Sequence, residues 1–251
     1  SVLAVPFPLH LAWIPVLYKD CKTIRQIKTN KTMPLVFIKD IDTDTRLGLW
    51  KIADELHADE VCPQMVCEEL KRKCTRRQKE TAAVYALLHA MTGRRDLIIG
   101  HNADGKPTLD GYIISVSHTI GYASIIMSRT SNVAVDVEYR NNRVFRIVDK
   151  FLTKQETALL NGLLPTEDTT LKTIASLTES HDAQTALLLC WCAKETIYKY
   201  FSEEKLMFDE MQTCLEEFGQ EGTFHCTNLR QDIKKTITYM QNEDFVLTYT
   251  L

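Results

Sequence analysis

Two acidic residues in the run AVDVE stand two positions apart in a segment that alternates like a β-strand. On a strand, Asp136 and Glu138 project from the same face, while Val135 and Val137 enter the core. Neighbouring carboxylates repel each other, and a divalent cation such as Mg²⁺ removes that repulsion because it takes oxygen ligands. A solvent-exposed strand edge with two acids is the plain alternative, so the pair alone is weak evidence for a metal site.

A third acid lies in the run WCAKETIYKY, whose apolar residues have helical spacing. Glu195 and Lys199 are four residues apart and fall on the side of this helix opposite its apolar stripe. An ordinary ion pair within the helix is one interpretation. The functional interpretation makes Glu195 a metal ligand or general base, with Lys199 facing a developing phosphate charge.

The run IIGHNADGKPTLDGYIISVSHT begins like a phosphate-binding P-loop, with Gly100, four residues, then Gly105 and Lys106. A P-loop continues with Ser or Thr and leads into a helix, but here Pro107 and a strand follow. The P-loop interpretation therefore fails, and the tetrapeptide DGKP taken alone is a turn.

Two basic runs accompany these residues. The run KRKCTRRQK at residues 71–79 holds six basic residues and no acid, which is also common in a solvated helix start. The run YRNNRVFRIVDKFLTK spaces five basic residues by three, three, four and four positions, namely Arg140, Arg143, Arg146, Lys150 and Lys154. On a helix they share one face, which is either an ordinary amphipathic surface or a docking face for an acidic partner.

The elements that must position these residues follow an α+β order. Hydrophobic patterning predicts helices at residues 73–93 and 183–201, and a capping box of Thr153 and Glu156 predicts another helix start. Strand patterns cover residues 35–41, 47–52, 112–118, 122–128, 132–138, 221–229, 235–240 and 244–251. We expect two α+β halves, residues 1–118 and 119–251, each an antiparallel sheet with packed helices, and a site between them.

The bulk composition narrows the class of protein. A net charge of -3 and a pI of about 6.2 disfavour a general binder of nucleic acid or anionic membranes. Eight cysteines without a CxxC pair favour a cytoplasmic protein with reduced thiols. The apolar opening, residues 1–18, is broken by three prolines and is expected to lie extended on the core. No segment approaches the roughly 20 apolar residues of a membrane span.

Five motifs together resemble a known family. They are GKP at 105–107, SVSHT at 115–119, VDVE at 135–138, FLTKQE at 151–156 and WCAKETIYK at 191–199. In this order they resemble the 4'-phosphopantetheinyl transferases, over about residues 105–200. The length and the mid-chain Asp136 are similar to the two-lobed, monomeric members that activate nonribosomal peptide and polyketide synthases.

The resemblance implies transfer of the phosphopantetheine arm of coenzyme A to a serine of an apo carrier protein, with release of 3',5'-ADP. Asp136, Glu138 and Glu195 would hold Mg²⁺, Glu195 would help deprotonate the serine, and Lys199 would offset charge on the leaving group. The implied coenzyme A contacts are Arg72, Arg76, Lys106, Pro107, Ser117, His118, Lys194 and Lys199. Carrier proteins of this kind present an acidic helix, which the basic stripe from Arg140 to Lys154 would receive.

Three positions depart from the family pattern. Ala134 replaces a usual glycine, Thr119 replaces a usual serine, and Tyr85 falls near where many members have an arginine. The loss of that arginine would weaken coenzyme A binding. A degenerate paralogue that binds coenzyme A or a carrier protein without efficient transfer is therefore the second hypothesis, although the three acids and Lys199 are all present.

Overall fold

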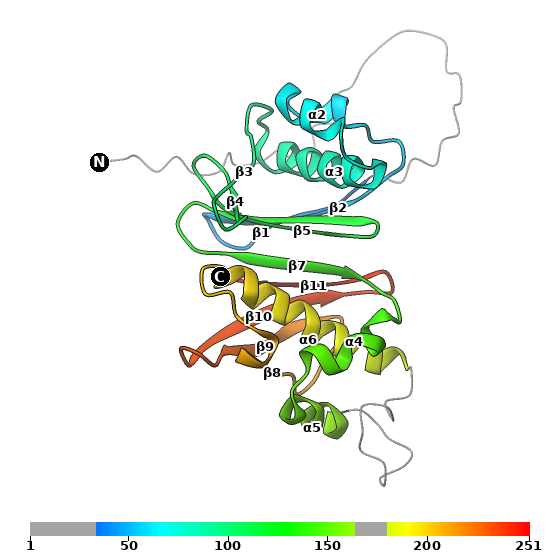
Figure 1. Ribbon diagram of the computed structural model, residues 1–251, viewed down its shortest axis with the longest axis vertical. Coiled ribbons are helices and arrows are strands. Elements are labelled where there is room, and N and C mark those ends of the chain that lie inside the picture. The colour runs from blue at the N-terminus through cyan, green and yellow to red at the C-terminus, as the bar shows by residue number, and fades with distance from the viewer. Residues whose placement is uncertain (1–33, 164–179) are drawn as a thin grey trace, which may run out of the picture.

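The computed structural model of the protein describes residues 34–163 and 180–251, so the opening segment 1–18 lies outside the described residues. Two antiparallel sheets lie one above the other in Figure 1, with helices on their outer faces. The four-stranded sheet has the order β1-β2-β6-β5, and the five-stranded sheet has the order β7-β11-β10-β9-β8. The expected α+β fold with two antiparallel halves is confirmed. No helix of the described ranges is both long and apolar enough to cross a bilayer.

The first half covers one face of its sheet with helix α3 (Thr75–Thr92), which ends at Gly93 in a left-handed conformation with φ 69°. The helix packs closely because Gly48 leaves room: a Cβ there would meet Leu87 at 2.8 Å and Met91 at 2.9 Å. The other elements of this half are β1 (Leu35–Asp40), β2 (Thr45–Lys51), α1 (Ala58–Val61), α2 (Gln64–Leu70), β3 (Gly100–His101), β4 (Pro107–Thr108), β5 (Ile113–Thr119) and β6 (Tyr122–Ser128).

The second half is built around helix α6 (His181–Tyr200), which Ser180 caps by accepting a hydrogen bond from the Ala183 amide at 3.1 Å. Apolar residues surround most of this helix, which packs on β7 and β11. The other elements are β7 (Ala134–Tyr139), α4 (Arg143–Phe151), α5 (Lys154–Leu163), the 3-10 turn η2 (Phe208–Glu210), β8 (Met211–Cys214), β9 (Glu221–Asn228), β10 (Ile233–Gln241) and β11 (Phe245–Thr250).

The predicted capping box at the start of α5 is confirmed. The Thr153 amide donates to Glu156 Oε2 at 2.8 Å, and the Glu156 amide donates to Thr153 Oγ1 at 3.2 Å. Reciprocal bonds of this kind satisfy two amides that the first helical turn leaves without partners.

The chain passes from the first sheet to the second between Ser128 and Ala134, which is later than the expected division at residue 118. Strand β6 pairs with both β5 and β2, so it belongs to the first sheet. The reason is a tight turn at Gly121, where φ is 82°, that folds β6 back on β5.

Edge strands β5 and β7 meet where the two halves join. Hydroxyl groups of β5 accept the amide hydrogen bonds of β7 at 3.2, 3.2 and 3.4 Å, in the pairs Ser115–Val135, Ser117–Val137 and Thr119–Tyr139. We call these three pairs the hydroxyl seam. Behind it, buried apolar residues of β2, β6, β7 and β11 form a single core cluster that both sheets share. The halves are therefore joined by both polar and apolar contacts.

Candidate active site

Asp136 lies on β7 at the centre of the seam, with 5% of its surface exposed. Its Oδ1 atom accepts hydrogen bonds from Ser117 Oγ at 2.8 Å and from Lys199 Nζ at 2.7 Å. Its Oδ2 atom is buried and has no hydrogen-bond partner. A buried carboxylate oxygen without a donor is unfavourable, and a bound cation would satisfy it.

Glu138 lies two residues further along the same face of β7. It accepts hydrogen bonds from Thr119 Oγ1 at 3.0 Å and from Trp191 Nε1 at 3.1 Å. Burial and the charge of Asp136 raise the pKa of this carboxyl above its ordinary value, and these two hydrogen bonds oppose the increase. The seam hydroxyls Ser117 and Thr119 therefore join the halves and also orient one acid each.

Glu195 faces these two acids from α6. Burial, followed by the charge of Asp136, raises the pKa of Glu195 to about 7, with a further contribution from Glu138, while Lys199 opposes the increase. A carboxyl group that titrates near neutral pH can take up and release a proton under cellular conditions. The raised pKa therefore makes Glu195 the acid of this group that is best suited to act as a general base.

The three acids have the chemistry that a hard divalent cation requires. The charge of Asp136 raises the pKa of both Glu138 and Glu195, and the Oδ2 atom of Asp136 is buried without a partner. They are not arranged as a finished metal site, since no cluster of three or more His, Cys, Asp or Glu residues within ranges 34–163 and 180–251 could hold a metal ion. A cation would have to draw the carboxylates together.

Lys199 does not form the ordinary helix ion pair with Glu195 that the sequence allowed; the salt bridges of the described residues join it to Asp136 instead. Its Nζ atom also donates to the Val135 carbonyl at 3.0 Å, so its side chain reaches from α6 to β7. This places a positive charge directly against the acids.

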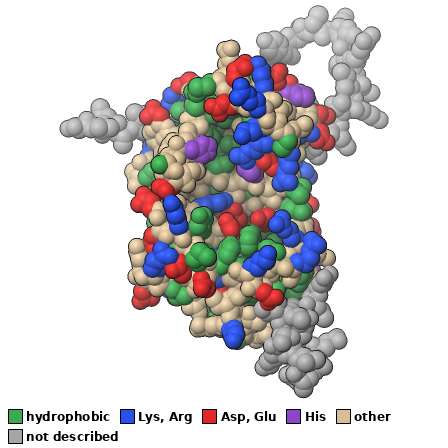
Figure 2. Space-filling view, viewed as in Figure 1, with side chains coloured by type: hydrophobic (Ala, Val, Ile, Leu, Met, Phe, Trp, Pro, Cys, Tyr) green, Lys and Arg blue, Asp and Glu red, His purple; other side chains and the backbone are tan. Residues whose placement is uncertain are grey.

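The GKP segment is a turn, as the sequence predicted, with Gly105 at φ 80° and β4 following it. It separates two pockets that share Gly105, Pro107 and Val116. The larger pocket, of about 370 Å³, is enclosed by α2, α3 and β5 and includes His118. The smaller pocket, of about 230 Å³, contains Lys106 and Lys199. In Figure 2, Lys, Arg and His side chains gather over the upper half, and acidic side chains lie near the middle.

The basic run at residues 71–79 contributes different residues from those expected. Lys73 and Arg77 line the larger pocket, whereas Arg72 and Arg76 are exposed and lie outside its lining. Arg77 is one position from Arg76 on α3, which is a rotation of about 100°, whereas Arg72 and Lys73 lie in the turn before this helix. The signal was present in the sequence, because Arg77 shares a helix face with the pocket residues Thr81, Val84 and Tyr85.

Tyr85, one of the three departures noted in the sequence, lies on α3. Its ring is 3% exposed, and its hydroxyl accepts a hydrogen bond from the Ile99 amide at 3.1 Å. It lines the larger pocket but adds no positive charge there. Arg77 on the same helix supplies a guanidinium to this pocket.

Two residues expected to contact coenzyme A, Ser117 and Lys194, form hydrogen bonds with other protein groups instead. Ser117 uses its hydroxyl for Asp136 and the Val137 amide, so it serves the seam rather than a phosphate. Lys194 is 0% exposed and donates to Glu156 Oε2 at 2.8 Å, with further bonds to the carbonyls of Phe151 at 2.6 Å and Phe208 at 2.9 Å. All three ammonium hydrogens are used, so the expectation of a Lys194 phosphate contact was wrong.

Lys194 and Glu156 form a buried ion pair that can be tested through stability. We expect Lys194→Met to lower the free energy of unfolding by about 3–5 kcal/mol, because it leaves Glu156 charged and buried without its cation. Adding Glu156→Gln should recover part of the loss. Urea denaturation of the single and double variants measures these changes in the free energy of unfolding. Weakened coenzyme A binding at unchanged stability would contradict the structural role.

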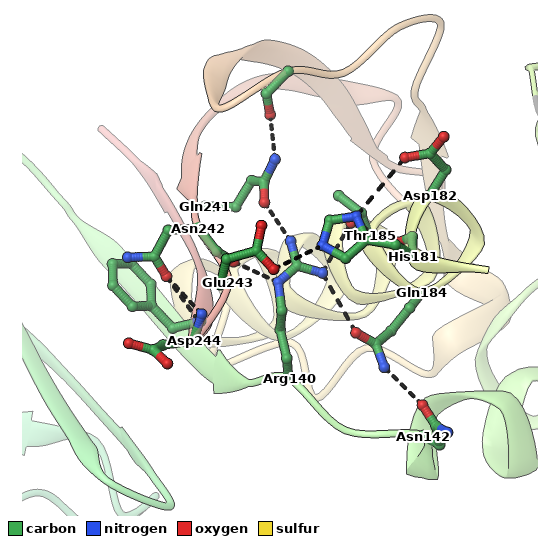
Figure 3. Close-up of polar contacts among 12 residues, drawn as sticks. Arg140, Asn142, His181, Asp182, Gln184, Thr185, Gln241, Asn242, Glu243 and Asp244 are labelled. Atoms are coloured by element: carbon green, nitrogen blue, oxygen red, sulfur yellow. Dashed lines mark hydrogen bonds and ion pairs between the residues drawn. The ribbon is translucent and has the colours of Figure 1, made fainter. Parts of the chain in front are cut away.

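The basic stripe is shorter than expected. Figure 3 shows Arg140 enclosed by α6 and the turn between β10 and β11. Its guanidinium donates to Thr185 Oγ1 at 2.9 Å, to the Asn242 carbonyl and to the Gln241 side chain. Lys154 belongs to α5, because α4 ends at Phe151. The exposed basic residues that remain on α4 are Arg143, Arg146 and Lys150.

Comparison with known proteins gives one family. The model of the 4'-phosphopantetheinyl transferase superfamily matches residues 132–250. No curated protein matches the chain. The matched range begins just before β7 and ends in β11, so it includes α6 as well. Over residues 132–250, which hold Asp136, Glu138 and Glu195, the chain is therefore similar to the 4'-phosphopantetheinyl transferase superfamily.

Proposed function

We propose that the protein transfers the 4'-phosphopantetheine arm of coenzyme A to a serine of an apo carrier protein in a Mg²⁺-dependent reaction. The observation that carries this proposal is the group of three acids at the seam, one of which has a pKa of about 7, beside a pocket lined with basic side chains. The superfamily match over the same residues supports it.

The nucleotide end of coenzyme A would occupy the larger pocket, where Lys73, Arg77 and His118 face its phosphates. Lys106 and Lys199 line the neighbouring pocket, which would place them beside the diphosphate. Asp136, Glu138 and Glu195 would hold Mg²⁺, which when bound neutralises charge on the diphosphate and on the leaving group.

Glu195 would accept the proton of the carrier serine. The serine oxygen forms a bond to the phosphorus that bears pantetheine, and the bond from that phosphorus to the oxygen of 3',5'-ADP breaks. The negative charge on the departing phosphate is met by Lys199, which already lies against the acids.

The decisive experiment incubates the protein with coenzyme A, Mg²⁺ and a panel of apo carrier domains. Transfer is measured as a gain in carrier mass equal to one phosphopantetheine arm. The expected result is a gain for at least one carrier that disappears with a chelator. No mass gain across fatty-acid, polyketide and peptide carriers would reject the enzyme hypothesis.

A second candidate function is binding of coenzyme A or a carrier protein without transfer. Two observations favour it: Tyr85 supplies no charge where relatives have an arginine, and the described acids do not form a finished metal site. Coenzyme A binding by calorimetry together with absence of transfer would establish this alternative.

The exposed basic face of α4 is the proposed docking surface for the carrier protein. Arg143 lines a small pocket with Glu138 and Trp191, which brings this face beside the acids. We expect Arg143→Glu with Arg146→Glu to raise the KM for the carrier about tenfold or more, with little change in coenzyme A affinity. The difference in carrier KM between wild type and this variant should shrink with added salt, because exposed charges are screened over about 8 Å at physiological ionic strength.

A matched control for this prediction is Lys39→Glu with Lys51→Glu on β1 and β2, which changes the net charge equally on another part of the surface. An unchanged KM for the carrier in the α4 variant would place the docking face elsewhere. An equal loss of coenzyme A affinity would assign these arginines to the nucleotide site.

A further inference from the structure

Glu80 on α3 is a carboxylate that the proposed mechanism does not use. It is 6% exposed and lies near two arginines and a histidine. Arg76 Nε is 2.8 Å from Oε1, while Arg77 Nη1 at 3.6 Å and His118 Nδ1 at 3.5 Å approach Oε2. An ordinary helix ion pair leaves both partners in water, but here both arginine side chains are exposed while the carboxylate is buried. A carboxylate buried in this way needs its partners to offset desolvation.

Arg77 and His118 also contact each other, through Arg77 Nη1 and His118 Nε2. Because a guanidinium can only donate, Nε2 accepts, and the proton of the neutral ring lies on Nδ1, which faces Glu80. Each of the three side chains therefore touches the other two. We call Glu80, Arg77 and His118 the Glu80 triangle.

The members of the Glu80 triangle lie at different distances from the larger pocket. Arg77 and His118 line this pocket, together with Lys73, whereas Glu80 is not part of its lining. The negative charge thus stands behind Arg77, whose guanidinium has further N–H groups that can donate to an anion. Lys199 and Arg76 are the other charged residues that act on His118, and both are cations.

We propose that Glu80 is a positioning residue that holds Arg77, directly and through His118, in the orientation in which its guanidinium binds a phosphate group of the nucleotide. The proposal rests on the proposed function, which supplies coenzyme A as the ligand. The carboxylate holds the guanidinium from the helix side and the imidazole through Nδ1, and the imidazole accepts from Arg77, so that the remaining N–H groups of the guanidinium face the pocket. Without it, Arg77 has no buried anchor and its side chain becomes free to turn into solvent.

Simple electrostatics and positioning make opposite predictions about this residue. Removing a negative charge beside an anion site strengthens anion binding if only the net field matters. Loss of a positioning contact weakens binding even though the net charge becomes more positive. Glu68 on α2 provides the matched control, because its carboxylate is an equal charge, is exposed and is not part of the pocket lining.

The experiment measures binding of coenzyme A and of dephospho-coenzyme A to the metal-free protein by calorimetry. We expect Glu80→Gln to weaken coenzyme A binding on the order of tenfold, while Glu68→Gln leaves it unchanged or tighter. Weaker binding of coenzyme A alone would show that the Glu80 triangle binds the 3'-phosphate. An equal loss of affinity for both ligands would show that it binds the diphosphate. A double-mutant cycle with Arg77→Gln should be non-additive, because the two side chains act together.

Binding by Glu80→Gln that is unchanged or tighter would overturn the proposal. Absence of coenzyme A binding by the wild-type protein would instead reject the proposed function. Thermal unfolding of each variant separates loss of folding from loss of positioning. If Glu80→Gln does not fold, Glu80→Asp keeps the charge but shortens the side chain, and undiminished binding by that folded variant would equally overturn the proposal.

Discussion

Asp136→Asn is expected to reduce carrier modification on the order of 10²–10³-fold and to abolish its dependence on Mg²⁺. The amide keeps an oxygen that accepts from Ser117 and Lys199, and its nitrogen replaces the buried Oδ2 atom that has no partner. The fold should therefore survive while the charge is lost. The measurement is the rate of carrier mass gain over a series of Mg²⁺ concentrations.

The same variant should also lower the pKa of Glu195, because the charge of Asp136 helps to raise it. The control is Asp149→Asn on α4, which removes an exposed carboxylate and should change neither the rate nor the Mg²⁺ dependence. Transfer by Asp136→Asn that keeps its full rate and its Mg²⁺ requirement would remove Asp136 from the site.

Glu195→Gln is expected to lower turnover on the order of 10²–10⁴-fold and to stabilise the ligand-free protein at alkaline pH. The folded-state pKa of about 7 is above the ordinary 4.5 of an unfolded chain, so the folded protein binds more protons between these values. Stability contributed by the protonated carboxyl is therefore lost as the pH rises from about 4.5 through about 7. Glutamine cannot ionise, so the variant does not suffer this loss.

Urea denaturation at pH 5 and pH 8 tests the sign of this effect. We expect the free energy of unfolding of Glu195→Gln, relative to wild type, to rise by about 1–2 kcal/mol from pH 5 to pH 8, after allowance for solvent screening of a partly exposed group. The exposed Glu203, just beyond α6, provides the control substitution Glu203→Gln. A constant difference across pH would show that Glu195 is not the acid with the raised pKa.

The sequence predicted the parts of the site that depend on short-range periodicity. Asp136 and Glu138 share a strand face because side chains alternate along a strand. Glu195 lies opposite the stripe of Cys190, Ala193 and Ile197 because a helix repeats every 3.6 residues. The DGKP turn followed from its Gly and Pro residues. Each of these conclusions needed fewer than ten residues of context.

The predictions that failed needed the partners of a side chain, which come from distant segments. Lys194 was expected to contact coenzyme A, but α5 and η2 supply its acceptors. Arg140 began a plausible stripe, but the turn between β10 and β11 encloses it. Ser117 could bind a phosphate only if β7 did not pass beside it, and no local pattern shows which edge strands of two sheets will meet.

The hydroxyl seam also limits how the two halves can move. Its three acceptors repeat every second residue, at 115, 117 and 119, as do the amides that they receive at 135, 137 and 139. Sliding one half along the other would align hydroxyls with amides again only after about 6.6 Å, the length of two strand residues. Every smaller displacement leaves these three amides, two of which are in buried residues, without their hydroxyl acceptors. The seam thus allows only discrete alignments of the two halves and opposes their gradual shear.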